Sequence, residues 1–336
     1  MTMDQPGRSE TRRQERQAIA ESLLSEPPPV DDLPGRVLST LDGQVLHASR
    51  SRPVVQWTLS VNGDGPERTV PVVGKGFRKG GGEQAWQLLR RLHGAGFDGP
   101  DFGVPQPYGY DPARQLLAQE AAPPRTLHDG LVSDPESALP DVRRVARWLA
   151  RLHDVGEVGL EALPSDFEHG KLASHAEALA ETLPGDGARI QSLSTRTAHV
   201  LAQVTSPCVT THGDFQPKNI HLDERRVVVI DFDRAAWAPP ARDIGHFIGQ
   251  SLTMAASRHG TLDSAASWVD AFVSTYQEAG GVANMHTDVP AYVARTFNEV
   301  LFYRLVVRPV RDQAFVPAWI DEWEHLVEQA ESEVAQ

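Results

Sequence analysis

An aspartate, an asparagine and a second aspartate lie close together in this 336-residue chain, as Asp214, Asn219 and Asp231. A carboxylate beside an acceptor hydroxyl can orient it and take its proton, whereas amide and carboxylate oxygens suit Mg²⁺. Phosphoryl transfer needs little more than such positioning and charge neutralisation. Taken singly, Asp214 could be a turn residue and Asp231 a strand end. Their order and spacing favour ATP- or GTP-dependent transfer instead, with Asp214 as base and Asn219 and Asp231 as Mg²⁺ ligands.

The nucleotide phosphates also need a cation, and Lys75 is the candidate. Period-2 alternation over 72–77 places Lys75 on the inward face of a predicted strand, where a lysine is costly to bury unless it is paired. Glu83, at the start of the next predicted helix, is the nearest partner in sequence, and Glu120 is an alternative. An exposed strand lysine is the simpler alternative.

Two neighbours of the motif suggest supporting roles. His212 lies just before Asp214, and although imidazole titrates near neutral pH, we assign it structural support of the loop. Asp233 could approach a second metal or bond to loop amides, and the second interpretation is favoured.

The elements that must position these residues change character along the chain. Residues 36–121 indicate a small nucleotide-binding lobe: strands over 37–39 and 44–47 around a turn at Asp42-Gly43, then strands over 54–61, 69–77 and 115–118 and one amphipathic helix. Residues 122–336 indicate a catalytic and acceptor-binding lobe that is mainly helical. Its helices are predicted around 142–152 and over 174–182, 188–204, 244–257, 265–279, 292–307 and 318–334. A hairpin over 219–230 carries the motif, and residues 1–35 are predicted to be a loosely ordered arm with one short helix.

Composition excludes several classes of protein. The net charge of −13 argues against nucleic-acid binding and is compatible with a cationic substrate. No apolar run is long enough to cross a bilayer, and the polar N-terminus does not resemble a signal peptide, so no membrane partner is expected. The single cysteine, Cys208, fits a reducing compartment and a cytoplasmic location.

The stretch His212-Gly213-Asp214, with Asn219 and Ile230-Asp231, resembles the aminoglycoside phosphotransferase and choline kinase family, which has a protein-kinase-like fold. The resemblance implies a two-lobed α+β fold, with a small antiparallel-sheet lobe carrying one helix and a larger helical lobe. It implies that Asp214 is the base, that Asn219 and Asp231 hold Mg²⁺, and that Lys75 is the phosphate lysine paired with a helix glutamate.

Three further assignments follow from the resemblance. Pro240-Ala241-Arg242-Asp243-Ile244 matches an element whose aspartate, Asp243, braces the catalytic loop. The stretch Gln119-Glu120-Ala121 matches the hinge whose backbone meets the adenine, which assigns Gln119 and Ala121 to nucleotide binding. No glycine-rich loop precedes Lys75, and Ala48–Arg52 is its substitute, which assigns Ser49 and Ser51 to the nucleotide as well.

Gln216 stands where protein Ser/Thr kinases carry a lysine, which favours a small hydroxylated acceptor such as an aminoglycoside-like antibiotic, a sugar or an amino alcohol. Asp321, Glu322 and Glu324 could attract a cationic acceptor, or they could form a solvated helix face. Two alternatives stay open: a kinase acting on Ser or Thr of a peptide in natural-product biosynthesis, and a non-catalytic nucleotide-binding pseudokinase.

Overall fold

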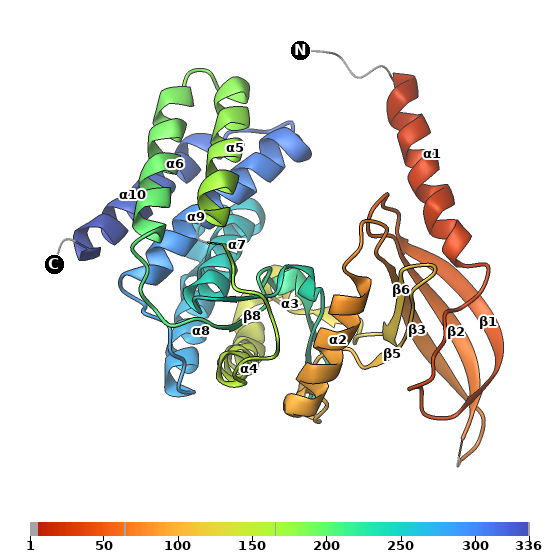
Figure 1. Ribbon diagram of the computed structural model, residues 1–336. Helices are drawn as coiled ribbons and strands as arrows, with labels where there is room; N and C mark the ends of the chain where they lie inside the picture. The colour runs from red at the N-terminus through yellow and green to blue at the C-terminus, as the bar shows by residue number, and fades with distance from the viewer. Residues whose placement is uncertain (1–5, 64, 165, 335–336) are drawn as a thin grey trace. The chain divides into compact units, whose positions relative to one another are not determined.

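The computed structural model describes residues 6–63, 65–164 and 166–334. They divide into two compact units (Figure 1). The first unit comprises Met1–Pro123 together with Val228–Asp233, and the second comprises Pro124–Val227 and Arg234–Gln336. The first unit therefore receives one short segment from late in the sequence. The predicted boundaries at 35 and 121 stay predictions, and residues 1–5 of the predicted arm lie outside the described residues.

The first unit is built on an antiparallel sheet of strand order β1-β2-β3-β6-β5, with helix α2 inserted after β3. The bounds are α1 Pro6–Leu23, β1 Arg36–His47, β2 Val54–Asn62, β3 Arg68–Gly76, α2 Gly82–Leu92, β4 Phe102–Gly103, β5 Pro107–Asp111 and β6 Leu116–Glu120. Alternate residues of β2, from Val55 to Val61, are fully buried and form the centre of this unit's core.

The predicted turn at Asp42-Gly43 is wrong, because β1 runs through it as one strand. Gly43 pairs with Trp57 of β2, and irregular register on either side of Asp42 absorbs the extra residues as bulges. The Asp42 carboxylate accepts the Gly43 amide at 2.8 Å. Continuous pairing with β2 outweighs the local turn preference of Asp-Gly, and the sequence does not show that pairing.

The N-terminal segment is more closely attached than the predicted loose arm. Within the described residues, α1 buries Ala20 completely, and Leu33 after it is 5% exposed. Both belong to the apolar core of the first unit, with Leu23 and Leu24 packed against it. Ala20 and Leu23 stand in a charged helix, and Leu24 and Leu33 follow it, so the apolar residues are too sparse to predict docking.

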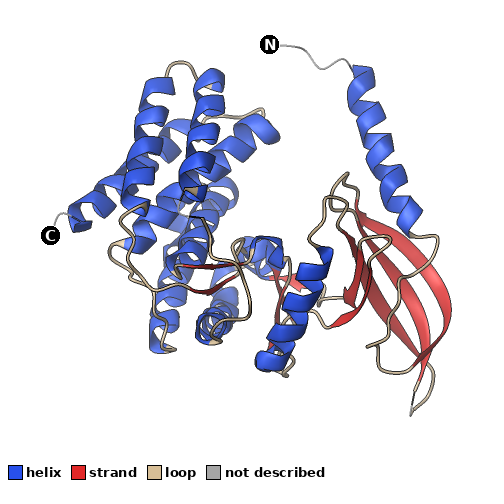
Figure 2. Ribbon diagram, viewed as in Figure 1, coloured by secondary structure: helices blue, strands red, loops and turns tan. Residues whose placement is uncertain are grey.

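The second unit is almost entirely helical (Figure 2). Its helices are α3 Leu127–Ser133, α4 Pro135–Asp154, α5 Phe167–Thr182, α6 Gly187–Leu201, α7 Ala241–His259, α8 Ala266–Glu278, α9 Asp288–Phe302 and α10 Val316–Val334. The helices predicted for this region are all present, but α4 and α5 begin well before the predicted starts, at Pro135 and Phe167, and α3 was not predicted. A π-turn over Tyr303–Val307 follows α9. The predicted α+β class, with an antiparallel sheet in one unit and helices in the other, is confirmed.

Short strands hold the sequence motif. They are β7 Arg125–Thr126, β8 Val209–Thr211, β9 Ile220–Leu222, β10 Val227–Val229 and β11 Ala236–Ala238. The turn between β9 and β10 forms as predicted, because the Asp223 carboxylate accepts the amides of Arg225 and Arg226 at 2.9 and 2.7 Å. No helix in the described part of the chain is long and apolar enough to cross a membrane.

Candidate active site

Asp214 lies at the centre of a set of hydrogen-bond donors in the second unit. His246 Nε2 lies 3.0 Å from Oδ1, and Gln216 Nε2 donates to both carboxylate oxygens at 3.2 Å. Asn219 Nδ2 donates to Oδ2 at 3.0 Å and to the Asp214 carbonyl at 2.9 Å. Burial alone would raise the pKa of Asp214, but the hydrogen bond from His246 and the positive charge of Arg234 lower it to about 2. Asp214 is therefore a carboxylate at neutral pH.

The loop that carries Asp214 is held by Asp243 at the start of α7. The fully buried Asp243 carboxylate accepts the amides of His212 and Gly213, both at 2.7 Å. Its Oδ2 also lies 3.3 Å from His153 Nε2. Burial by itself would raise the pKa of Asp243, but the hydrogen bond and charge of His153 lower it. His212 Nδ1 in turn accepts the Asp214 amide at 3.2 Å.

Phe215, next to Asp214, anchors the loop to the helices. It is fully buried and stacks on Trp148 of α4 at 5.8 Å, with Phe247 of α7 at 5.9 Å. Such aromatic pairs contribute about 0.5–1.5 kcal/mol beyond area burial. The buried Phe215 side chain therefore holds the backbone next to Asp214 in place, and this fixes the direction of the Asp214 side chain.

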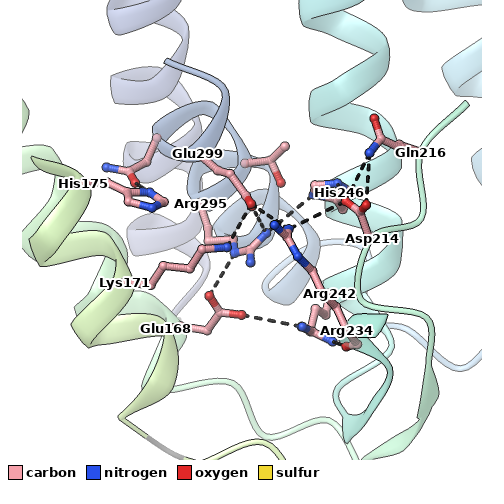
Figure 3. Close-up of polar contacts among 12 residues, drawn as sticks. Glu168, Lys171, His175, Asp214, Gln216, Arg234, Arg242, His246, Arg295 and Glu299 are labelled. Carbon is pink, nitrogen blue, oxygen red and sulfur yellow. Dashed lines mark hydrogen bonds and ion pairs between the residues drawn. The ribbon is translucent and has the colours of Figure 1, made fainter. Parts of the chain in front are cut away.

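A buried network of charges continues from His246 (Figure 3). Arg295 of α9 is 3% exposed, donates to Glu168 at 2.9 Å and pairs with Glu299 at 2.8 Å. Its Nη1 also lies 3.5 Å from His246 Nδ1. Because arginine can only donate, Nδ1 is an acceptor, and the imidazole proton is left on Nε2, facing Asp214. Arg295 thus selects the tautomer that donates to Asp214.

Glu299 joins this network to the loop after Asp231. Its Oε1 accepts from Lys171 at 2.9 Å and from Arg234 at 2.8 Å (Figure 3). Burial would raise the pKa of Glu299, but the nearby charges of Arg295 and Lys171 hold it well below its usual range. The acidic charges of the network are therefore matched by cations on four elements.

A pocket of about 630 Å³ opens beside Asp214 in the second unit. Its lining comes from the motif loop, α3, α7, α9 and the π-turn that follows. The lining includes Asp214, His246 and Glu299, and it also includes Lys218, Arg258 and Arg304. An acceptor molecule in this pocket would have a hydroxyl-orienting carboxylate within its walls.

Lys75, in the first unit, has acquired partners that differ from the predicted ones. Its ammonium pairs with Asp231 and, at 2.7 Å, with Asp233. Among the described residues Glu83 is not an ion-pair partner of Lys75, so the predicted pairing is not seen. The reason is topological: the segment Val228–Asp233 belongs to this unit and brings two carboxylates to a lysine side chain that is 13% exposed. Asp233 thus bonds to side chains, whereas loop amides had been favoured.

The two predicted Mg²⁺ ligands belong to different units, Asn219 to the second and Asp231 to the first. Asn219 uses its amide nitrogen to bind Asp214, and its Oδ1 takes no part in those bonds. Asp231 uses Oδ1 for Lys75, and its side chain is 41% exposed. Its φ of 73° lies in the left-handed region, which non-glycine residues occupy mainly at turns and functional sites. One amide oxygen and one carboxylate oxygen are the hard ligands that Mg²⁺ takes beside phosphates.

The remaining predicted nucleotide residues lie in the first unit. Ser49 Oγ accepts the amides of Ser51 and Arg52 at 3.4 and 3.2 Å, so it closes the loop between β1 and β2. Gln119 lies on β6, paired with Val73 of β3, and Ala121 follows that strand. Their nucleotide-binding roles, and that of Glu83, stay predictions. Sequence reasoning missed Arg52, whose Nε donates to Asp233 at 2.9 Å.

The acids proposed to attract a cationic acceptor have another task. Asp321 and Glu324 of α10 both pair with Arg189 of α6, the former at 2.8 Å. Neither they nor Glu322 lines the pocket beside Asp214. These ion pairs join two packed helices, α6 and α10. The sequence of α10 alone cannot show which residues of another helix lie opposite its acids.

Sequence reasoning also missed His246, Arg295 and Glu299. A signal existed, because Arg295 interrupts an apolar helix and Glu299 follows it at the i+4 position. A charged pair inside an apolar stripe indicates a buried ion pair. Nothing in the local pattern, however, joins it to Asp214.

Comparisons with known proteins agree with this geometry. The phosphotransferase enzyme family matches residues 79–287, more than half of the chain. A methylthioribose kinase of Bacillus velezensis is 40% identical over 73 residues. That match covers 20% of this chain and 18% of that enzyme, so the chain spans less than a fifth of the curated relative that it matches.

Solved structures show the same fold. A spectinomycin phosphotransferase, in complex with ADP and spectinomycin, has a TM-score of 0.59 and 14% identity, covering 94% of this chain and 97% of that chain. An amicoumacin kinase, in complex with AMP-PNP and Ca²⁺, has a TM-score of 0.60 and 12% identity over 96% of each chain. At this identity the likeness concerns the fold alone, and it is the kinase-like fold that the sequence predicted.

Proposed function

Because the chain belongs to the phosphotransferase enzyme family, we propose that it transfers the γ-phosphoryl group of ATP or GTP to a hydroxyl of a small molecule. The observation that carries the proposal is an ionised Asp214, held by His246, Gln216 and Asn219, on the wall of a 630 Å³ pocket. ADP and AMP-PNP in the similar structures support a nucleotide co-substrate. A cytoplasmic location, where both nucleotides are abundant, completes the proposal.

In the proposed reaction the acceptor oxygen forms a bond to the γ-phosphorus, and the bond from that phosphorus to the β–γ bridging oxygen breaks. The hydroxyl proton passes to the Asp214 carboxylate, and the nucleoside diphosphate leaves. A carboxylate with a pKa of about 2 is a weak base. Asp214 therefore acts first by orienting the hydroxyl, and takes the proton only as the new bond forms.

Asn219 Oδ1 and the Asp231 carboxylate would hold Mg²⁺, as their order in the sequence predicts. The ion neutralises charge on the nucleotide phosphates when it is bound. Lys75 would contact the phosphates, for which it would exchange at least one of its present carboxylate partners. His212 and Asp243 would hold the loop that carries Asp214 through their hydrogen bonds to its backbone amides.

The test is a measurement of nucleoside diphosphate release with Mg²⁺ across a panel of hydroxylated small molecules. Asp214→Asn keeps the shape of the side chain and removes its charge, and we expect it to lower turnover about 100-fold or more, with nucleotide binding retained. Asp154→Asn is the matched control, because the Asp154 side chain is 82% exposed on α4.

Each outcome of this test has a definite meaning. Equal turnover by Asp214→Asn would contradict the assignment of the base. Nucleotide binding with no transfer to any acceptor would favour the pseudokinase, and transfer only to Ser or Thr of peptides would favour the peptide kinase.

A further inference from the structure

The pocket beside Asp214 has an unusual distribution of charge for a chain with a net charge of −13. From it we propose that the acceptor carries an anionic group, a carboxylate or a phosphate, bound by Lys218, Arg258 and Arg304. This inference rests on the proposed function, since it names the chemical class of the molecule phosphorylated in the same pocket. It replaces the cationic acceptor that composition allowed.

The acidic side chains of the pocket are already neutralised by protein groups. Glu299 pairs with Arg234 and Arg295, each at 2.8 Å, and with Lys171 at 2.9 Å. Asp214 bonds to His246 and lies 3.7 Å from Arg234. A cationic acceptor would therefore meet carboxylates that are already neutralised by ion pairs, and it would be repelled by the arginines that neutralise them.

Other cations in the pocket lining differ from Arg234 and Arg295 in their partners. Among the residues that the structure describes, neither Lys218 nor Arg258 has a carboxylate partner. Burial first, and then the charges of Lys218 and Arg258, lower the pKa of His128 on the same pocket wall. Lys218 of the motif loop and Arg258 of α7 therefore both act on His128 of α3, although Asp129, 3.8 Å from His128 Nδ1, acts in the opposite direction.

Arg304 extends this cationic wall from the π-turn after α9. Its guanidinium donates to Ser257 Oγ at 2.7 Å and lies 4.8 Å from the centre of the Phe315 ring. Burial first, and then the charge of Arg258, lower its pKa. Its buried Nε has no hydrogen-bond partner among the described residues. Because like charges packed together raise the free energy of the empty pocket, an anion bound among them would gain the attraction of all and relieve that repulsion.

The experiment compares the binding of hexoses of one shape and different charge. Glucose 6-phosphate and glucuronate are the anionic probes, glucose is neutral and glucosamine is cationic. Each is titrated calorimetrically at constant ionic strength and millimolar concentration, with ADP and Mg²⁺ saturating so that the nucleotide site is filled. We expect at least one anionic probe to bind about ten-fold more tightly than glucosamine.

Two charge reversals locate the binding. Arg258→Glu and Lys218→Glu should each weaken the anionic probe about ten-fold and leave glucose unchanged. Arg143→Glu is the matched control, because Arg143 is an exposed residue of α4 outside the pocket, and it should change nothing. Melting temperatures of all variants show that they are folded.

The proposal would be overturned by tighter binding of glucosamine, by no binding of either anion, or by anion binding that both reversals leave intact. Competition between the anion and ADP would overturn it as well, because the cations would then serve the nucleotide. The proposed function fails separately. It is judged by Mg²⁺-dependent nucleotide turnover and its loss in Asp214→Asn, which the class of acceptor does not affect.

Discussion

Asp214 works through its neighbours. Three side chains donate to its carboxylate, and two of them, Gln216 and Asn219, come from its own loop. The third, His246, comes from α7 and owes its tautomer to Arg295. Because Asp214 bonds to His246 through Oδ1 and to Asn219 through Oδ2, its plane is fixed. The neighbours of Asp214 therefore fix the orientation of its carboxylate and also keep it ionised.

His246 is the residue where this imposed direction can be tested. His246→Ala removes a hydrogen bond to a charged group, and we expect kcat to fall about ten-fold or more, with the KM for nucleotide unchanged. His246→Gln keeps an N–H near the position of Nε2 and should restore part of the loss. Steady-state kinetics on both variants check this prediction, and equal losses in the two would refute a positioning role.

Asp243 carries a prediction about stability and pH. Its pKa is lower in the folded chain than the ordinary value of 3.8. The carboxylate therefore contributes stability above pH 3.8, and this contribution is lost as the pH falls further towards the folded pKa. We expect Asp243→Asn to lower the free energy of unfolding by about 2–3 kcal/mol at pH 7, because the new amide group would face the His212 or Gly213 N–H.

The measurement is urea unfolding of the native chain and Asp243→Asn from neutral pH to below pH 4. The difference between the two should be constant down to about pH 4–5 and shrink below that. A difference that does not change with pH would show that the charge of Asp243 is not what stabilises the loop.

At the scale of elements, the sharpest constraint lies in the link between β8 and the turn that bears Asn219. Gly213 has a φ of +80°, and a Cβ there would collide with the Arg234 carbonyl and the Arg242 guanidinium. Its amide is also one of the two that Asp243 binds. The glycine lets the chain turn tightly next to the start of α7. The His212 amide can then bond to Asp243 while the Asp214 side chain lines the pocket.

Gly213→Ala should therefore lower the free energy of unfolding by at least about 2 kcal/mol and abolish turnover. Gly170→Ala is its matched control: Gly170 lies in α5 with no other atoms near a Cβ, so alanine should stabilise by about 0.5–1 kcal/mol. Thermal or urea unfolding of the pair decides the matter. A Gly213→Ala protein as stable as the native chain would mean that the loop adapts easily.

At the scale of the whole molecule, the two units are not two consecutive stretches of sequence. The chain leaves the first unit at Pro123, returns for Val228–Asp233, and leaves again at Arg234. That return brings Asp231 and Asp233 to Lys75, so the ion pairs of Lys75 depend on this short segment.

Lys75→Met should therefore loosen the first unit in particular. The loss of the ion pairs with Asp231 and Asp233 should speed hydrogen exchange of β3 and β6 amides about five-fold, corresponding to about 1 kcal/mol, and leave α8 unchanged. Lys79→Met, at an exposed position of the same unit, is the control. Equal acceleration in α8 would show that the pairing stabilises the molecule as a whole.

The sequence by itself determined the class of fold, the helices and the reaction. Asp214, Asn219 and Asp231 are recognised from their order and spacing along the chain. Hydrophobic periodicity and turn preferences are also local properties of the sequence, which is why the Asp223 turn and α4 to α10 were predictable. Where a local preference competed with a partner strand, as at Asp42-Gly43, the partner prevailed.

Only the tertiary structure decided the partners of the charged groups. Lys75 meets carboxylates from a segment far along the chain, and His246 links Asp214 to Arg295. The cations of the acceptor pocket likewise come from separate elements. Electrostatic energy depends on distance in space, and the sequence lists charges without those distances. The sequence therefore predicts a phosphotransferase, whereas the proposed class of acceptor is argued from the arrangement of charge in the pocket.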